Sequence, residues 1–279
     1  MLVFSGPAGA AHSTLLGRGP TEFFAPGAAP CVVGLHGFSG TAAELRPLLD
    51  RIAAAGFAVD AALLAGHGTN PTDLQKLGFD DWVAGVRDRL RQIANRRGTF
   101  VLLGFSLGSL VAMQIASETD RPKGLAGLVV LGNALTLGPF TRQGLAALSR
   151  LGSRMPDLYL FKTQSGDVCD RSALASIVTY DRHPLRAAIK TYLAGPRVRG
   201  IVGRITCPTL ILHGRRDRTC PWQNAVWLAD HIGSKDVSVR IFERSGHVLA
   251  NDFERDDVAV EVCAFLGRLR RAQSEPVDP

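Results

Sequence analysis

The stretch VLLGFSLGSLVA, residues 101–112, places one serine between two glycines at the point where an apolar run turns and then continues. The apolar run before the turn is typical of a buried strand, and the small and apolar residues after it favour a helix. A solvated loop would make this connection with Asn, Asp or Pro and would not need two glycines. The stretch therefore predicts a sharp strand-to-helix turn at Ser106, with glycine required at positions 104 and 108.

Short apolar runs alternate with segments of helical period on both sides of this turn. Thr41 is a candidate N-cap for one of these helices, with Glu44 completing a capping box. Strands that are apolar on both faces and joined by helices predict an α/β fold, in which helices flank a mostly parallel sheet. The predicted strands are 31–37, 57–64, 99–105, 125–132, 208–214 and 237–242, and the predicted helices are 41–56, 80–97, 107–118, 221–232 and 256–271.

The alternation is interrupted once, over residues 136–205. This span contains no segment typical of a central strand and shows three weaker helical patterns, at 142–152, 171–180 and 183–193. A loop of that length without structure is uncommon in a compact domain. We therefore expect a core formed by residues 1–135 and 206–279, with a short helical cap inserted at 136–205.

Composition argues against several classes of protein. No apolar run approaches the roughly 20 residues that span a bilayer, so we expect no membrane insertion. The first 20 residues lack the basic start and unbroken apolar segment of a signal peptide, which predicts a cytoplasmic protein. The 5 cysteines are scattered, which argues against a disulfide framework and against zinc spacing.

The net charge of +7 raises the possibility of a nucleic-acid partner. However, the arginines of segments 87–97 and 268–271 alternate with apolar residues at helical spacing, which is typical of the solvated faces of amphipathic helices. No glycine-rich segment lies between a strand and a helix in the manner of a phosphate-binding loop. We therefore expect no nucleic-acid partner, no metal and no cofactor. Nothing in the sequence indicates the oligomeric state.

Ser106 is a candidate nucleophile because the predicted turn exposes its hydroxyl at the start of a helix. The backbone N–H of Leu107 then lies beside the helix dipole, where it could stabilise an oxyanion. A serine hydroxyl needs a base, and the base needs an orienting acid. Asp217 follows a strand in LILHGRRDRTCP and His247 follows the last strand, so both are expected at the edge of the sheet that Ser106 occupies.

Each of these three residues has a structural alternative. Ser106 could be an ordinary N-cap, and His247 could be a structural imidazole, as we expect for His36 and His213. Asp217 lies among three arginines and could be an ion-paired surface carboxylate. Three other carboxylates are alternative acids, namely Asp167, Asp170 and Asp236.

The glycine-rich stretch LHGFSG, residues 35–40, follows the first predicted strand of the parallel sheet. Its glycines allow the backbone to pass close to the nucleophile, so the N–H of Phe38 is the second candidate oxyanion donor beside that of Leu107.

The ordered motifs HGFSG, GHGTNP, GFSLGS, HGRRDRTCP and SGHV resemble those of the α/β-hydrolases, in particular the bacterial carboxylesterase and monoacylglycerol lipase branch. The resemblance covers residues 21–269. It implies a serine carboxylester hydrolase with the triad Ser106, Asp217 and His247. It also implies Phe38 and Leu107 as oxyanion donors, and a cap over an apolar acyl pocket. Thr-Cys-Pro at 219–221 replaces the family's frequent Val-Pro, so the resemblance leaves the preferred substrate open.

Apolar side chains in the cap support a small apolar ester as the substrate. They outnumber what three short helices can bury among themselves, so some should roof a pocket. We expect hydrolysis of short- to medium-chain esters, with monoacylglycerols as candidates, through an acyl-enzyme on Ser106. The same triad could serve a thioesterase, an acyltransferase or a hydrolase of carbon–carbon bonds, and a non-catalytic ligand receptor is a further alternative. The side chains in question are Phe140, Leu145, Leu148, Met155, Leu158, Leu160 and Phe161.

Overall fold

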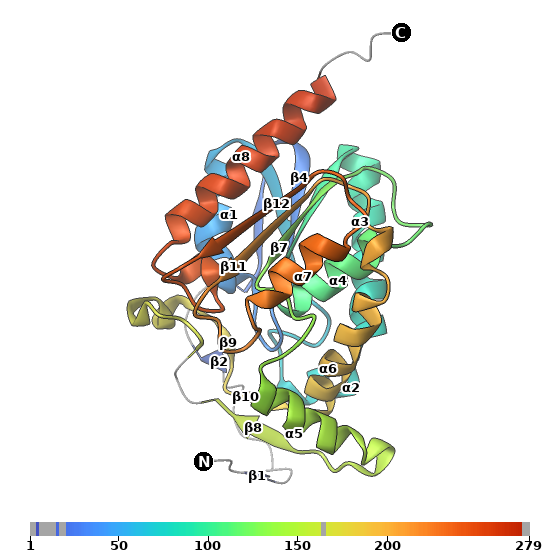
Figure 1. The fold of residues 1–279 in the computed structure, drawn as a ribbon, viewed down its shortest axis with the longest axis vertical. Coiled ribbons are helices and arrows are strands. Elements are labelled where there is room, and N and C mark those ends of the chain that lie inside the picture. The colour runs from blue at the N-terminus through green and yellow to red at the C-terminus, as the bar shows by residue number, and fades with distance from the viewer. Residues whose placement is uncertain (1–3, 6–14, 17–20, 163–165, 275–279) are drawn as a thin grey trace.

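The computed structural model describes residues 4–5, 15–16, 21–162 and 166–274. Its centre is a seven-stranded sheet with the order β12–β11–β7–β6–β4–β5–β3 (Figure 1). All neighbouring strands are parallel except β3, which pairs antiparallel with β5, so the predicted, mostly parallel sheet is confirmed. The strands are β3 (Phe23–Ala25), β4 (Ala28–Leu35), β5 (Phe57–Ala61), β6 (Phe100–Phe105), β7 (Leu125–Leu131), β11 (Thr209–Gly214) and β12 (Val237–Phe242).

Helices cover both faces of the sheet (Figure 1). One face carries α1 (Arg46–Ala54) and α8 (Arg255–Ser274), and the other carries α3 (Phe79–Arg97), α4 (Leu107–Ala116) and α7 (Gln223–His231). Successive side chains of β6 alternate between the two resulting cores. Val101 and Leu103 belong to the core under α1 and α8, and Leu102 belongs to the core under α3 and α4. Double-sided burial explains why this strand is a continuous apolar run.

The predicted helix 41–56 begins differently from the expectation. A short 3₁₀ turn, η1 (Ala42–Glu44), precedes α1, and the Thr41 hydroxyl accepts a hydrogen bond from the N–H of Ala43. The Glu44 carboxylate does not complete a capping box. It accepts a hydrogen bond of 3.0 Å from the N–H of Gly37. The capping-box prediction was wrong because the 3₁₀ turn ends at Glu44 and leaves its carboxylate within reach of the loop after β4.

The segment between β7 and β11 contains strands as well as helices. The patterns at 142–152 and 183–193 correspond to α5 (Pro139–Ser149) and α6 (Leu185–Arg199). The helix predicted at 171–180 was wrong, because this stretch forms a short 3₁₀ helix, η3 (Arg171–Ser176), followed by a strand, β9 (Thr179–Tyr180). Strands of two or three residues show no alternation of apolar and polar side chains. β8 (Tyr159–Phe161) and β9 pair with the distant β1 (Phe4–Ser5) and β2 (Leu15–Leu16), so sequence patterning could not reveal them. The elements are α5 (Pro139–Ser149), η2 (Gly152–Arg154), β8 (Tyr159–Phe161), η3 (Arg171–Ser176), β9 (Thr179–Tyr180), β10 (Arg182–Pro184), α6 (Leu185–Arg199) and η4 (Val202–Arg204).

Two further short helices connect elements of the core, α2 (Pro71–Lys76) and η5 (Leu249–Asn251). No helix within the described ranges combines the length and the apolar character needed to cross a bilayer. The first 20 residues, on which the signal-peptide interpretation rests, lie mostly outside the described residues.

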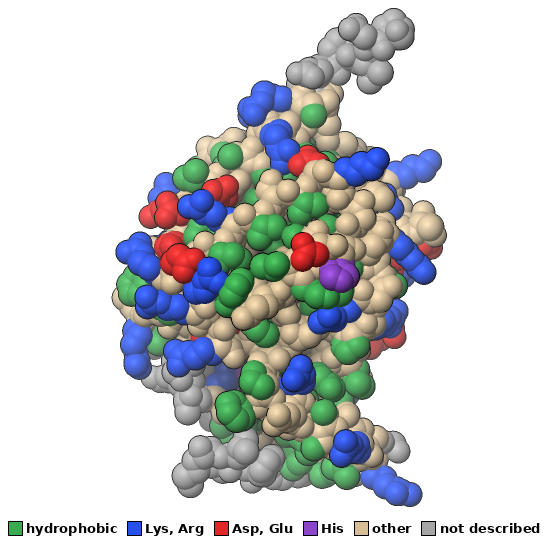
Figure 2. Space-filling model, in the orientation of Figure 1, with side chains coloured by type: hydrophobic (Ala, Val, Ile, Leu, Met, Phe, Trp, Pro, Cys, Tyr) green, Lys and Arg blue, Asp and Glu red, His purple; other side chains and the backbone are tan. Residues whose placement is uncertain are grey.

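Basic side chains are dispersed over the face seen in Figure 2, and several lie beside acidic ones. Arg215 pairs with Glu243 at 3.0 Å, and Arg268 pairs with Asp236 at 2.8 Å. Exposed pairs of this kind contribute little to stability. They do show that part of the positive charge is locally neutralised.

The turn between β6 and α4 brings three pieces of backbone into close contact. A Cβ atom at position 108 would lie 2.1 Å from the carbonyl oxygen of Leu35 in β4, and one at position 104 would lie 2.5 Å from the carbonyl oxygen of Gly108. Both distances are impossible for a side-chain carbon without movement of the backbone. Glycine at these two positions therefore allows α4 to start directly beside β4.

We predict that Gly108→Ala lowers the free energy of unfolding by about 2–4 kcal/mol, because the new methyl group must displace backbone in the packed core. Gly85→Ala in α3 is the matched control. A Cβ atom there meets nothing within 4 Å, so this change should raise stability by about 0.5–1 kcal/mol. Urea unfolding of both variants checks the prediction, and equal stability of the two would contradict it.

Candidate active site

Three polar side chains meet where the strands of the sheet end. Ser106 follows β6, Asp217 lies in the loop after β11, and His247 lies in the loop after β12. Parallel strands present their carboxyl ends at the same edge of a sheet, which is where α/β proteins bind ligands. Asp217 and His247 therefore lie at the same edge of the sheet as Ser106, as expected from the sequence.

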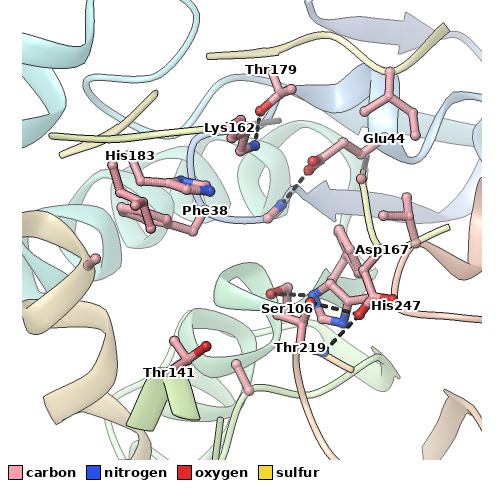
Figure 3. A pocket seen from close by; sticks show the side chains of 18 of the residues that line it. Phe38, Glu44, Ser106, Thr141, Lys162, Asp167, Thr179, His183, Thr219 and His247 are labelled. Atoms are coloured by element: carbon pink, nitrogen blue, oxygen red, sulfur yellow. Dashed lines mark hydrogen bonds between the residues drawn. The ribbon is translucent and has the colours of Figure 1, made fainter. Parts of the chain in front are cut away.

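Ser106 adopts a backbone conformation that few non-glycine residues tolerate, with φ 52° and ψ −115°. Such a conformation costs roughly 1–3 kcal/mol and persists only where the surrounding structure imposes it. The Ser106 side chain makes no capping hydrogen bond to α4, so the N-cap interpretation does not describe its contacts. Its hydroxyl oxygen instead lies 3.0 Å from Nε2 of His247 (Figure 3).

Hydrogen bonds connect Ser106, His247 and Asp217 in a chain. Nδ1 of His247 lies 2.7 Å from Oδ2 of Asp217. A carboxylate oxygen can only accept, so Nδ1 carries the proton and Nε2 is left to accept from the Ser106 hydroxyl. The tautomer that a general base requires is therefore the one this geometry selects.

The charges of Asp217 and His247 set the protonation states of these two residues. Burial alone would raise the pKa of Asp217, but the His247 charge, reinforced by hydrogen bonds from His213 and His247, holds this pKa well below its usual range. Burial alone would lower the pKa of His247, but the Asp217 carboxylate outweighs it and raises that pKa above 6.5. The acid is thus ionised, and the imidazole becomes a stronger base.

His213 is a second imidazole on the same carboxylate. Its Nε2 lies 2.9 Å from Oδ2 of Asp217 and 3.1 Å from the carbonyl oxygen of Cys220, so it donates to both. The other oxygen, Oδ1, accepts from the N–H groups of Thr219 and Cys220 at 2.9 and 2.7 Å. His213, expected from the sequence to be structural, was not predicted to contact Asp217. The spacing of four residues in HGRRD was the available signal.

The alternative acids are bonded elsewhere. Asp236 pairs with Arg268, and Asp170 pairs with Arg255 at 2.8 Å. The Asp167 carboxylate accepts from the N–H and hydroxyl of Thr219 and from the N–H of Arg218. None of these carboxylates forms the hydrogen bond to His247 that Asp217 forms.

The loop after β4 lies beside the serine turn, because Leu35 pairs with Gly104 across β4 and β6. His36 fixes this loop, since its Nδ1 lies 2.9 Å from the carbonyl oxygen of Gly37 and its Nε2 accepts from the N–H of Leu64. Burial lowers the pKa of His36 to about 4, so the ring is neutral at pH 7. Phe38 follows in the same loop, and Leu107 is the first residue of α4.

A cavity of about 890 Å³ opens onto Ser106 and His247 (Figure 3). This volume is in the range of small-molecule sites, about 300–1,000 Å³. Of the apolar cap residues expected to roof a pocket, Leu145, Leu160 and Phe161 line this cavity. Phe140 does not, since its side chain is 89% exposed. The others, Leu148, Met155 and Leu158, pack in a small core of the inserted segment.

Two aspartates hold the inserted segment against the loops around it. The sequence indicated Asp167 only as an alternative acid, and it did not indicate Asp252. The Asp252 carboxylate accepts four N–H groups, from Cys169, Asp170, Gly246 and Phe253, at 2.7–2.9 Å. A further hydrogen bond has its acceptor in the inserted segment, since the carbonyl oxygen of Asp167 accepts from the N–H of His247 at 2.8 Å. The segment around Asp167 is thereby joined to the loops that carry Asp217 and His247.

Within the described part of the chain, no group of three or more His, Cys, Asp or Glu side chains is arranged to hold a metal ion.

A family model described as serine aminopeptidase, S33, matches residues 27–254. The chain belongs to this family of α/β-hydrolases. It is a serine hydrolase, and the resemblance to the carboxylesterase and monoacylglycerol lipase branch is confirmed by its relatives.

Among the relatives of this hydrolase is a thermostable monoacylglycerol lipase of Bacillus sp. strain H-257, 26% identical over 90% of this chain and 95% of that protein. A carboxylesterase of Bacillus subtilis is 24% identical over 90% of this chain and 97% of that protein. A solved structure of a metagenome-derived lipolytic enzyme has a TM-score of 0.80 and 25% identity, over 91% of this chain and 99% of that one.

We predict that Asp252→Asn destabilises the hydrolase by about 2–4 kcal/mol, because an amide keeps one acceptor oxygen and turns two donors toward N–H groups that then lack a partner. Asp256→Asn is the control, since Asp256 forms an exposed pair with Arg51. It should change stability by less than about 0.5 kcal/mol. Urea unfolding measures both, and a small effect of Asp252→Asn would contradict the role given to its four hydrogen bonds.

Proposed function

We propose that this hydrolase cleaves short- to medium-chain carboxylic esters through an acyl-enzyme on Ser106. The observation that carries the proposal is the hydrogen-bonded chain from Ser106 through His247 to Asp217, which opens onto a cavity with largely apolar walls. A serine activated in this way performs acyl transfer on substrates whose carbonyl carbon reaches its oxygen.

In the first half-reaction, the oxygen of Ser106 attacks the ester carbonyl carbon while Nε2 of His247 takes the hydroxyl proton. The carbonyl oxygen becomes an oxyanion, to which the N–H groups of Phe38 and Leu107 donate in our assignment. When the tetrahedral intermediate collapses, the bond to the alcohol oxygen breaks and His247 returns its proton to the alcohol. The ionised Asp217 stabilises the imidazolium throughout this step.

In the second half-reaction, water takes the place of the alcohol. His247 removes a proton from the water as its oxygen attacks the acyl carbon, and the bond to Ser106 then breaks. The proton returns to Ser106, and the carboxylic acid leaves. No redox partner or cofactor is needed, because each step moves only one proton and one acyl group.

The cavity supports a small acyl group of limited length. We assign residues 136–205 as the cap of this hydrolase, since Leu145, Leu160 and Ile177 from this segment line the cavity onto which Ser106 opens. Each methylene buried against such walls is worth about 0.8 kcal/mol, so specificity should rise with chain length until the cavity is full. Relatives described as a monoacylglycerol lipase and a carboxylesterase support the same substrate class.

The proposal predicts a maximum of kcat/KM at short to medium chains when p-nitrophenyl esters from acetate to palmitate are compared. Ser106→Ala should lower turnover by several orders of magnitude on every ester, since the nucleophile is lost. Circular dichroism and the melting temperature show whether this variant remains folded.

Near-normal hydrolysis by a folded Ser106→Ala variant would overturn the assignment of the nucleophile. A maximum at palmitate, or no dependence on chain length, would instead contradict the enclosed acyl site while leaving the nucleophile in place.

A further inference from the structure

The wall of the cavity contains charged side chains that ester hydrolysis does not use. Among the described residues that line it, four carry formal charges, Glu44, Lys162, Asp167 and Arg171. Most of the remaining lining is apolar or hydroxyl-bearing, so these charges are the strongest polar features that a bound substrate meets. Their partners decide which of them remain available to it.

The two anions are occupied by backbone donors. Glu44 accepts from the N–H of Gly37, and Asp167 accepts from the N–H groups of Arg218 and Thr219. A carboxylate with such partners has fewer free lone pairs for a ligand. Burial also raises the pKa of Glu44 to about 7, against the opposing effects of Lys162 and Gly37, so a share of this group is neutral at pH 7.

The two cations have no such partners. Nζ of Lys162 donates to the Thr179 hydroxyl at 2.5 Å, and no carboxylate in the described ranges lies within ion-pair distance of it. Arg171 is exposed and also lines the cavity, and its guanidinium forms no hydrogen bond or ion pair with any described residue. Burial lowers the pKa of Lys162 to about 8, with Glu44 opposing, so most of its charge remains at pH 7.

The Lys162 ammonium is held in place beside the loop that follows β4. Its partner Thr179 donates its own hydroxyl proton to the carbonyl oxygen of Ser39 at 2.8 Å. Ser39 in turn contacts His183, whose ring stacks on Phe38 with centroids 5.4 Å apart (Figure 3). Burial keeps the pKa of His183 well below 6.5, so this neighbour is neutral and does not compete for an anion.

We propose that Lys162 and Arg171 form a subsite for a carboxylate carried by the ester substrate, so that the hydrolase accepts half-esters of dicarboxylic acids. An ion entering an apolar cavity without a partner loses hydration that nothing replaces. A preplaced ammonium and a guanidinium supply charge-assisted hydrogen bonds in its stead. This inference rests on the proposed ester hydrolysis.

The test compares the mono-p-nitrophenyl ester of suberic acid with p-nitrophenyl octanoate, which has the same chain length and lacks the carboxylate. The readout is the ratio of their kcat/KM values at pH 7 and low salt. Lys162→Met should lower this ratio by about tenfold to a hundredfold, the usual effect of losing a hydrogen bond to a charged group. Lys162→Arg keeps a positively charged donor and should therefore lower the ratio less than Lys162→Met does.

Lys123→Met is the matched control, because Lys123 is exposed in the chain before β7 and does not line the cavity. This control should leave the ratio unchanged. If Lys162→Met does not fold, Lys162→Gln and Arg171→Gln measure the same ratio, and each should lower it.

If the ratio is the same in the wild type and in Lys162→Met, the proposed carboxylate subsite is wrong. Hydrolysis of the octanoate ester would still support the proposed esterase activity in that case. An equal fall on both esters would also overturn it, because Lys162 would then act on the reacting atoms that the two esters share. If the wild type hydrolyses neither ester, the proposed function fails together with the inference.

Discussion

The hydrogen bond between Nδ1 of His247 and Oδ2 of Asp217 is the contact on which the proposed chemistry depends. It joins the loops after two neighbouring strands, β11 and β12, and both side chains are almost fully buried. The bond fixes the imidazole tautomer and raises the pKa of His247, which turns its free nitrogen toward Ser106 as a base. A buried carboxylate is stable there only because His213, His247 and two backbone N–H groups satisfy its oxygens.

The inserted segment contributes hydrogen bonds to this arrangement. Asp167 accepts the N–H of His247 with its carbonyl oxygen and the N–H of Thr219 with its carboxylate, so one residue connects the loops of the base and of the acid. The Asp252 carboxylate accepts N–H groups of Cys169 and Asp170 in the same segment. This part of the inserted segment is therefore bound directly to the loops of the site. α5 contributes Leu145 to the cavity wall, whereas its Phe140 is almost wholly exposed.

The sequence was informative where function depends on local backbone. Gly104 and Gly108 around Ser106 have a steric requirement that involves one strand, one helix and the neighbouring β4, so a five-residue pattern predicted the turn. The placement of Asp217 and His247 at one edge followed from the alternation of strands and helices. Both inferences need only the order of elements and the handedness of their connections.

The contacts that sequence reasoning missed are long-range. Asp252 binds N–H groups 82 and 83 residues away, and no local pattern marks it. Glu44 was assigned to a helix cap because its spacing from Thr41 fits one, and only the three-dimensional approach of Gly37 shows where its carboxylate goes. The strands β8, β9 and β10 were not predicted for a related reason, since they are defined by the strands with which they pair and not by a pattern in their own residues.

The pH dependence of covalent labelling at Ser106 tests the central claim most directly. An organophosphonate reacts only with a serine whose proton a neighbouring base removes, and peptide mass spectrometry locates the label. We predict one phosphonyl group per chain, on Ser106, at a rate that rises with pH through a single step above 6.5 as His247 loses its proton. A label on another residue, or a rate on Ser106 that is flat from about pH 5 to pH 9, would contradict the account.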